Sequence, residues 1–492
     1  MEQVQNETAR VQGWCPGAWR PMPSGDGLVL RVRPPLGRLT AAQCLRLARL
    51  AASHGAGVVE LSSRANVQLR GLAGARHATV LRALAGAGLL DADAALERRR
   101  NVVIDPLWRA GDGVLALAQR LQAAIAQAPG LADLPAKFGW AVVRNAQGLQ
   151  EWPADVRLLP AAPGSAGSPE GRPAAWWVQP DGQPWALAAA TAEDAVATAI
   201  ALAQWCATQA QALRQQGQRP MRLRALLAAW QAAQPPAMAA MRAVQQTAQQ
   251  TAQKAAQKAA QEATPKATSP WPSMPPWPLP AGVWRCALPA AWSAAPLLPP
   301  APGWLPGLGW LAAAPLGRIS ARALARLAGA LHEAPGAVPG APLLRITPWR
   351  MVLIEMAQKP DTHWLQAAGL LDAQQWLTGA DDARLRVSAC PGAPACHQAL
   401  TPTQALALAL AEHVPPGAHL HISGCPKGCA RQQPATVTLY ATPPEDSGGC
   451  AAPPLFALVR NGACHDRPNA YWSAQALHEP PALVAARLFA QP

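Results

Sequence analysis

The sequence predicts an α+β fold built from two copies of one larger unit. The segment "PLGRLTAAQCLRLARLAA" at 35–52 matches "PLGRISARALARLAGAL" at 315–331, and "LAGAGLLDAD" at 84–93 matches "LQAAGLLDAQ" at 365–374. Both pairs are offset by about 280 residues, and the elements between them follow the same order. A repeat of this length is typical of a duplicated domain and not of a short-repeat array.

Each copy begins with elements in the order β-α-β-β-α. The first helix has Thr40 as its N-cap in one copy and Ser320 in the other. Short apolar runs bounded by polar residues mark the strands. We expect the strands at 27–34, 57–63 and 66–72 in the first copy and at 307–315, 342–347 and 350–356 in the second. Such a unit, with helices on one face of a mixed sheet, is ferredoxin-like, and we expect it at 13–95 and 283–380.

Two further matching segments follow each of these units. "RRRNVVIDP" (98–106) corresponds to "RLRVSACP" (384–391), and "LPAKFGWAVVRN" (134–145) corresponds to "GAHLHISGCPKG" (417–428). Each is a strand running into a loop, which predicts a second domain of mixed α/β character in each copy. We expect these domains at 96–230 and 381–480.

The two copies differ in the side chains on these loops. The second copy carries cysteines on both loops, whereas the first offers Lys137, with Asp105 and Arg144 nearby. A Gln/Ala-rich and then Pro-rich segment at 245–282 separates the copies. Prolines remove backbone donors and fix φ, so we expect a linker at 231–282 without a catalytic role.

Composition and charge narrow the functional class. The 492 residues carry a net charge of +14, which suits a polyanionic substrate. No nucleic-acid recognition motif accompanies this charge, so we expect no nucleic-acid partner. The N-terminus is polar, and Glu193 and Asp194 interrupt the Ala-rich stretch 186–203, which we expect to be a soluble helix. We therefore expect a cytoplasmic protein without a membrane partner, whose thiols stay reduced.

Four cysteines cluster within forty residues and form the strongest chemical signal. Cys390 and Cys396 form a C-x5-C pair, and after 28 intervening residues Cys425 and Cys429 form a C-x3-C pair. Structural zinc usually takes closer pairs, whereas an all-cysteine [4Fe–4S] cluster tolerates varied spacing. The glycines Gly392, Gly424 and Gly428 would let the backbone pass close to a bulky cluster and adopt positive φ. The pattern favours a cluster over zinc and over ordinary buried thiols.

These cysteines and the first-copy loops resemble the nitrite and sulfite reductase superfamily. In that superfamily four such cysteines bind a [4Fe–4S] cluster and the last bridges to sirohaem iron, which implies that Cys429 lies nearest the reaction centre. "SSRANVQLRG", "RRRNVV" and "LPAKF" resemble its oxyanion-binding and tetrapyrrole-binding segments. The likeness assigns substrate binding to Arg64, Gln68, Arg100, Asn101 and Lys137. It also implies two sirohaem-reductase-like α/β domains related by pseudo-twofold symmetry.

One branch of the superfamily fits better than the reductases do. The reductases commonly carry a second lysine where this chain has Gly139. "CPGAWRPMPSGDGLVLRVRPPLGRL" at 15–39 is similar to the opening of the precorrin-3B synthases, the cobalamin-pathway branch. The role of Cys15, within this opening, stays unassigned. "RANVQLRG" and "SGCPKGCA" match that branch as well.

This resemblance implies an O₂-dependent monooxygenase. The branch hydroxylates precorrin-3A and forms a γ-lactone in aerobic cobalamin biosynthesis, and is described as carrying a [4Fe–4S] cluster and a mononuclear non-haem iron. The partners implied are the tetrapyrrole, O₂ and an unidentified electron donor, an NAD(P)H-linked one among the options. His397, His419 and His421 lie near the cysteines, but each is more often a hydrogen-bonded polar residue than a ligand. The catalytic residues and the iron ligands stay unassigned.

Two other interpretations remain open at this point. The first is a sulfite or nitrite reductase, which would hold sirohaem beside the cluster. The second is a non-catalytic iron–sulfur protein that carries electrons.

Overall fold

The structure is a computed structural model with two compact units, one of residues 1–97 and 298–492 and the other of 98–297. The residues that it describes are 15–146, 152, 154–161, 173–232, 280, 283–287, 300–334, 343–443 and 453–490. Most of the predicted linker 231–282 lies outside the described residues. The finer division into five domains stays a prediction.

The first ferredoxin-like copy has the predicted order. Its strands are β1 (Met22–Ser24), β2 (Gly27–Val32), β4 (Val58–Leu61) and β5 (Val67–Leu72), and its helices are α1 (Ala41–His54) and α2 (His77–Gly86). Thr40 caps α1 as predicted: its hydroxyl accepts the Gln43 N–H, and the Gln43 side chain accepts the Thr40 N–H. This reciprocal pair fixes where the helix begins.

The second copy repeats the first element by element. Its strands are β12 (Gly303–Leu305), β13 (Gly309–Ala313), β15 (Leu344–Ile346) and β16 (Met351–Glu355), and its helices are α8 (Ala321–Ala330) and α9 (Thr362–Ala367). Ser320 caps α8 through the Ala323 N–H. Leu36 and Leu316 occupy the same left-handed turn before the two helices, with φ of 53° and 56°. The α+β class and the duplication are confirmed.

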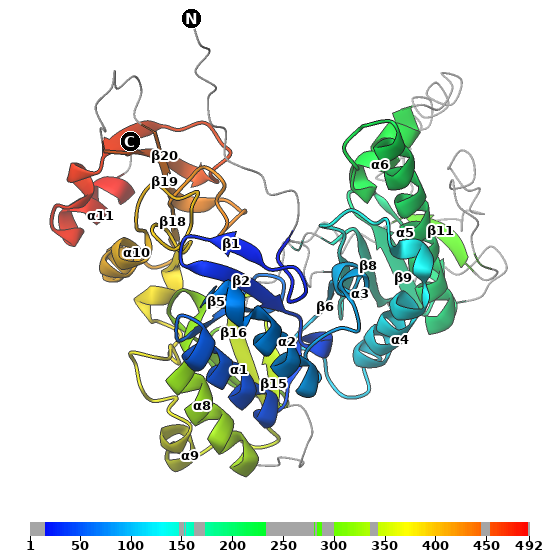
Figure 1. Ribbon diagram of the computed structural model, residues 1–492, viewed down its shortest axis with the longest axis horizontal. Helices are drawn as coiled ribbons and strands as arrows, with labels where there is room; N and C mark the ends of the chain where they lie inside the picture. Colours follow the sequence, from blue (N-terminus) through cyan, green and yellow to red (C-terminus); the bar gives the residue numbers. More distant parts are fainter. Residues whose placement is uncertain are drawn as a thin grey trace, which may run out of the picture. The chain divides into compact units, whose positions relative to one another are not determined.

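The two copies exchange their edge strands. β3 (Arg38–Leu39) leaves the first copy and pairs with β15, and β14 (Arg318–Ser320) leaves the second copy and pairs with β4. The resulting sheets have the orders β1-β2-β5-β4-β14 and β12-β13-β16-β15-β3. Helices α1 and α8 lie side by side (Figure 1), so each copy is completed by the other.

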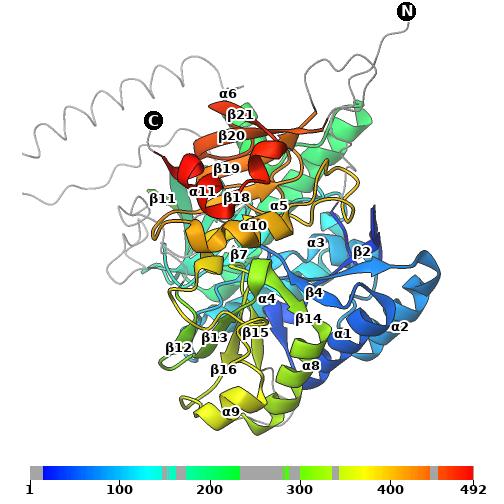
Figure 2. The same cartoon turned by 90° about the vertical axis from the view of Figure 1, so that its left-hand side faces the viewer.

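A third sheet in the same unit carries the four predicted cluster cysteines. Its order is β17 (Val387–Ala389), β18 (Leu420–Ser423), β19 (Ala435–Thr442), β20 (Leu455–Gly462) and β21 (Ala470–Ser473). Helices α10 (Gln404–Leu410) and α11 (Pro481–Phe489) cover one face, as Figure 2 shows. Leu420 and Ile422 of β18 point into this core with Leu410, Val484 and Leu488. His421 and Ser423 therefore face the opposite side.

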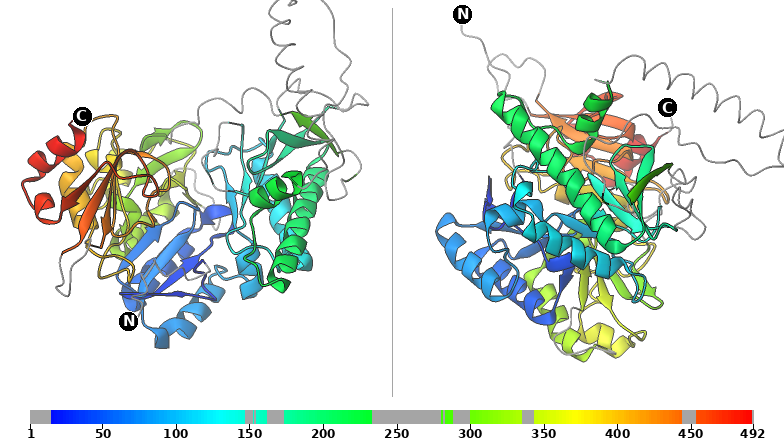
Figure 3. Two further views of the ribbon diagram at one scale, coloured as in Figure 1. Left: turned by 90° about the horizontal axis from the view of Figure 1, so that it is seen from above. Right: turned by 90° about the vertical axis from the view of Figure 1, so that its right-hand side faces the viewer.

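The other unit contains a six-stranded sheet of order β11-β10-β9-β8-β7-β6. The strands are β6 (Val102–Ile104), β7 (Trp140–Val142), β8 (Val156–Pro160), β9 (Trp176–Pro180), β10 (Trp185–Ala189) and β11 (Val283–Ala287). Helices α4 (Val114–Gln127) and α5 (Ala192–Gln215) pack side by side against it (Figure 3), and α6 (Leu223–Ala232) follows α5. Helix α3 (Ala94–Arg99) spans the boundary between the units.

Two sequence expectations differ from this sheet. The segment 186–203 is not one helix, because Trp185–Ala189 forms the fully buried strand β10, and the helix begins only after the Thr191 cap. A run of small apolar residues suits a strand covered on both faces as well as a helix. Val283–Ala287, expected to open the second copy, pairs with β10 instead. Within the described residues, no helix is long and apolar enough to cross a membrane.

Candidate functional site

Two parallel strands bring the four cysteines to one edge of their sheet. β17 pairs with β18 in parallel, with Val387 opposite Leu420 and Ala389 opposite Ile422. Cys390 follows β17 directly, and Cys425 comes two residues after β18. Because the carboxyl ends of parallel strands meet at one edge, the C-x5-C and C-x3-C loops start side by side. In the sequence, the only sign that the two cysteine loops lie together is that each of them follows a predicted strand.

The two cysteine loops interlock through their backbones. The Leu400 N–H donates to the Gly424 carbonyl at 2.8 Å, and the Gly424 N–H donates to Cys390 Sγ at 3.2 Å. A Cβ at Gly424 would lie 2.6 Å from the Cβ of Ala399, so only glycine permits this approach. Gly392 and Gly428 have the expected positive φ, whereas Gly424 does not. An N–H aimed at a cysteine sulfur is the donor that a thiolate ligand needs.

The four thiols also share one electrostatic environment. The pKa of Cys429 is raised to about 11, first by removal from water and then by Cys425, Cys390 and Cys396, while Lys427 opposes the shift. Burial likewise raises the pKa of Cys425, and Cys390 and Cys396 add to it. Crowding of this kind disfavours thiolates unless a positive group binds them. The thiols therefore suit a cationic iron–sulfur core.

The four cysteines differ in their exposure to solvent. Among the described residues, no group of three or more His, Cys, Asp or Glu side chains is placed so that it could hold a metal ion. Cys390 and Cys425 are buried and Cys396 is half-buried. Cys429 keeps exposed surface as a residue, although the protein around its thiol is dense enough to raise the pKa.

A fifth cysteine lies beside this site and was not anticipated from the sequence. Cys464 stands in the β20–β21 connection, is buried, and has its Sγ 3.9 Å from Nδ1 of His421. A Cβ at Gly428 would lie 2.9 Å from Cys464 Sγ, so the thiol packs directly against the Cys425–Cys429 loop. Cys464 lies 35 residues beyond Cys429 and belongs to no spacing motif, so only the fold reveals it.

Burial favours the neutral form of His421 in β18 and of His419, which directly precedes that strand. The pKa of His421 is lowered to about 3 and that of His419 to about 4, in both cases chiefly by burial. His419 Nε2 lies 3.1 Å from the Ser388 hydroxyl, while His421 Nε2 is buried without a partner in the described part of the chain. His397 is exposed. The three histidines do not converge on one point.

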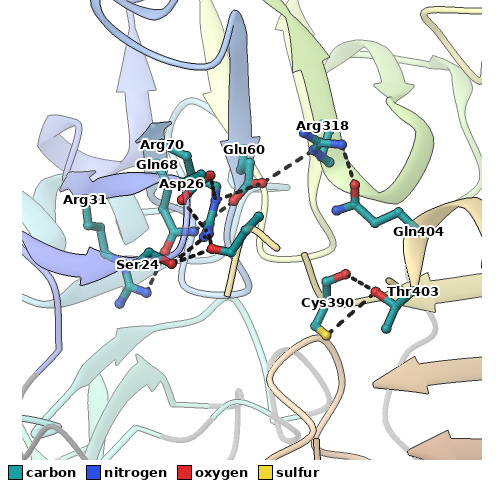
Figure 4. A network of polar contacts seen from close by, with 11 residues as sticks. Ser24, Asp26, Arg31, Glu60, Gln68, Arg70, Arg318, Cys390, Thr403 and Gln404 are labelled. Atoms are coloured by element: carbon teal, nitrogen blue, oxygen red, sulfur yellow. Dashed lines mark hydrogen bonds and ion pairs between the residues drawn. The ribbon is translucent and has the colours of Figure 1, made fainter. Parts of the chain in front are cut away.

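A hairpin of the first copy rests on the first cysteine loop. The Ser24 hydroxyl and the Arg70 guanidinium both donate to the Ala395 carbonyl, at 2.6 and 2.5 Å. A Cβ at Gly25 would lie 1.8 Å from the Pro394 carbonyl oxygen, so the hairpin and the loop are in backbone contact. Figure 4 shows Ser24 beside Arg70, and the ion pair of Arg70 with Asp26. The first copy thus supports the loop between Cys390 and Cys396.

Glu60 connects Arg70, which contacts the first cysteine loop, with the predicted substrate residue Gln68. Its carboxylate lies 3.4 Å from Arg318 Nε and 3.9 Å from Arg70 Nε, and accepts from the Gln68 amide at 3.4 Å. Burial raises the pKa of Glu60, and the arginines oppose that shift. The Gln68 carbonyl in turn accepts from Arg31 at 2.7 Å. Gln68 therefore fixes the positions of the Glu60 and Arg31 side chains through its two hydrogen bonds.

Arg31 of β2 lies near the predicted substrate residues and was not singled out in the sequence. Burial lowers the pKa of Arg31 to about 10, with Cys15, Arg33 and Arg64 as the strongest charged neighbours. Arg31 and Arg64 therefore bring two cations to the same part of the first copy. The alternating R-x-R of "LRVRP" is the signal that could have indicated Arg31. Such a pair suits the carboxylates of an anionic substrate.

The remaining predicted residues lie in the other unit, just before two parallel strands. Arg100 and Asn101 precede β6, and Lys137 precedes β7 by three residues. The Trp140 N–H donates to the Asn101 carbonyl at 3.1 Å, which ties the two strand starts together. Asn101 is buried and Lys137 is exposed. These three residues therefore share one sheet edge.

A buried carboxylate fixes the segment that carries Lys137. Asp155 is fully buried, and its Oδ2 accepts the Gly139 N–H at 2.9 Å and Arg222 Nη2 at 2.8 Å. Its own N–H donates to the Gly139 carbonyl at 2.7 Å. Gly139, which replaces the second lysine of the reductases, is thus held on both sides.

Strand register corrects one correspondence between the copies. Ile104 lies opposite Val142 as Ala389 lies opposite Ile422, so Asp105 occupies the place of Cys390 and Arg144 that of Gly424. The Arg144 N–H approaches Asp105 Oδ2 at 3.4 Å, as the Gly424 N–H approaches Cys390 Sγ. Lys137 is therefore not the counterpart of the cysteine loop, because it lies at the opposite end of β7. An Asp105–Arg144 ion pair of 3.2 Å stands there instead.

Comparison with known proteins agrees with this geometry. Residues 20–87 match the nitrite/sulfite reductase ferredoxin-like half domain. A precorrin-3B synthase of Sinorhizobium sp. is 26% identical over 472 residues, covering 94% of this chain and 85% of the relative. The NirA protein of Mycobacterium tuberculosis has a similar fold, with a TM-score of 0.56 and 18% identity over 92% of this chain and 78% of NirA. The resemblance to precorrin-3B synthase and to the nitrite/sulfite reductase fold is confirmed.

Proposed function

We propose that this protein is a precorrin-3B synthase, an O₂-dependent monooxygenase that hydroxylates precorrin-3A and forms a γ-lactone in aerobic cobalamin biosynthesis. The observation that carries the proposal is the similarity to a precorrin-3B synthase along nearly the whole chain. In the proposed reaction one oxygen atom joins the macrocycle and the other leaves as water. The two electrons and two protons come from a donor, for which we propose an NAD(P)H-linked protein.

Cys390, Cys396, Cys425 and Cys429 are the proposed ligands of a [4Fe–4S] cluster. A cluster held there would supply electrons one at a time. The chain contributes the Gly424 N–H at Cys390 Sγ, and the glycines at which the two loops approach each other. The hairpin of Ser24 and Gly25 holds the first loop in place. We leave the ligands of any non-haem iron unassigned.

The substrate carries many carboxylates, and the proposed role of the cations is to bind them. Arg64, with Arg31 beside it, would bind through planar guanidinium groups, and Gln68 orients Arg31 through its carbonyl. Arg100 and Lys137 would bind carboxylates as cations from their own sheet edge, and Asn101 would act there as a neutral hydrogen-bond donor. Lys137 is exposed and offers a compact charge, on a segment that Asp155 fixes at Gly139.

The rival activity is a sirohaem-dependent sulfite or nitrite reductase. The fold is compatible with it, because residues 20–87 match the nitrite/sulfite reductase ferredoxin-like half domain. Gly139 in place of a second lysine favours the synthase, since a small oxyanion needs a dense group of cations. A non-catalytic electron carrier would have no use for the Arg31–Arg64 pair.

A visible spectrum and a turnover assay together test the proposal. Protein purified without oxygen should show the broad absorption of an iron–sulfur cluster, whereas an intense Soret band would identify sirohaem and contradict the proposal. Incubation with precorrin-3A, O₂ and a reductant should yield a product with one added oxygen atom. R64A should lower turnover strongly, while R49A, which removes an exposed arginine of α1, should not. Equal loss in both variants would refute the assigned role of Arg64.

A further inference from the structure

Arg350 occupies an unusual backbone position next to the cysteine loops. It lies in the turn between β15 and β16 with a φ of +60°, a conformation that side-chain-bearing residues rarely adopt. Ala65 occupies the same corner of the first copy with a φ of +52°. In both corners the hydroxyl of the first turn residue, Ser62 or Thr347, accepts an N–H four residues later. The two copies therefore share one corner but place different side chains on it.

The surroundings of Arg350 are built to receive its longer side chain. A Cβ at Gly317 would lie 2.8 Å from the Cβ of Arg350, so the alkyl chain packs directly over that glycine. A Cβ at the equivalent Gly37 would lie 3.8 Å from the Cβ of Ala65 and 3.4 Å from the Ile346 carbonyl oxygen, so this glycine is less closely covered. The Arg350 side chain extends to the second cysteine loop, where its Nη2 donates to the Ala430 carbonyl at 2.8 Å. Ala430 follows Cys429 directly, so the guanidinium is anchored beside that cysteine.

The charge of Arg350 acts on the cysteines from this place. Its electrostatic partners are Glu60, Cys429 and Cys390, one cysteine from each loop. A guanidinium remains protonated even when it is largely removed from water. A cluster with four thiolates would carry net negative charge, and each added electron would increase it. A fixed cation nearby favours the reduced form.

We propose that Arg350 is the positive charge that the second copy places at the cluster, and that it raises the cluster's reduction potential. The first copy has Ala65 at this corner and Asp105 in place of Cys390, so it has neither the cation nor the thiol. Arg350 is in this view a positioning and tuning residue. The inference rests on the cluster that the proposed function includes.

The test is a redox titration of the cluster, followed by electron paramagnetic resonance, in wild-type protein and in R350Q, R350K and R345Q. R350Q should disfavour the reduced cluster by about tenfold, which is about 59 mV toward negative potential for a one-electron couple. R350K keeps the charge, so its potential should shift from the wild-type value by no more than half as much as that of R350Q. R345Q removes a buried arginine that pairs with Glu355 in the same sheet and should not shift the potential.

Several results would overturn the inference. It is wrong if R350Q titrates like wild type, if R345Q shifts as far as R350Q, or if R350K shifts as far as R350Q. Where R350Q does not fold, R350M replaces it, because methionine keeps an alkyl chain over Gly317 while removing the charge. Wild-type protein that contains no iron or sulfide would overturn both this inference and the cluster part of the proposed function. A wild-type cluster whose potential ignores Arg350 would overturn the inference alone.

Discussion

Substitution of Gly25 by alanine tests whether the first copy supports the cysteine loop. The new Cβ would lie 1.8 Å from the Pro394 carbonyl oxygen, and contacts under 3.0 Å are essentially never seen. The loop must therefore move away from the hairpin, and with it from Arg70 of β5, by at least 1.2 Å. Such a movement breaks the 2.6 Å bond from Ser24 and the 2.5 Å bond from Arg70 to Ala395.

The expected cost follows from the two bonds that are lost. A hydrogen bond from a charged donor contributes about 1.5–3 kcal/mol, and a neutral one about 0.5–1.5 kcal/mol. We therefore expect G25A to lower the free energy of unfolding by about 2–4 kcal/mol, measured by urea denaturation. It should also lower the iron content after reconstitution, because the loop between Cys390 and Cys396 loses its support.

A matched control separates this contact from the general effect of adding a methyl group. Gly74 lies in the same copy without positive φ, and nothing lies within 4 Å of the Cβ that alanine would add there. G74A should therefore leave the stability and the iron content unchanged. Equal behaviour of G25A and G74A would refute the contact between the hairpin and the loop.

Three further predictions concern residues around the two sheets. G428A should cost about 1–2 kcal/mol of unfolding free energy through its positive φ and its contact with Cys464, and a double-mutant cycle with C464A should recover the contact part alone. D155N should destabilise the protein by about 3 kcal/mol in thermal unfolding, because it leaves Arg222 facing a neutral buried group. Burial lowers the pKa of His421 to about 3, so the unfolded chain binds its proton first as the pH falls. The unfolding free energy should therefore decrease below about pH 6.5, by about 1.4 kcal/mol per pH unit for this histidine, and H421Q should flatten that slope.

Local patterns were sufficient for the repeated elements. The Thr40 and Ser320 caps, and strands such as Val67–Leu72, were predicted because a cap or an apolar run acts within a few residues. The exchange of β3 and β14 was not predicted, because pairing between distant edge strands leaves no local signal. Strand β10 was assigned to a helix, since Ala-rich sequence suits both when it is fully buried.

In the candidate site too, local patterns were predicted from the sequence and contacts between distant residues were not. The cysteine spacing and the matching strands predicted that Cys390 and Cys425 would meet, and the two strand ends place them at one edge. The correspondence of Lys137 with the cysteine loop was wrong, because only strand register shows that Asp105 takes the place of Cys390. Cys464 and Arg350 lie far from any motif and reach the loops through tertiary contacts.

Incorporation of isotopically labelled oxygen decides whether the protein is a monooxygenase that acts on precorrin-3A. Precorrin-3A is incubated with the purified protein, a reductant and ¹⁸O₂, and the product is analysed by mass spectrometry. We expect a product that carries one ¹⁸O atom, which C429A protein does not form. Unchanged precorrin-3A, together with rapid reduction of sulfite or nitrite by the same preparation, would contradict the proposed function.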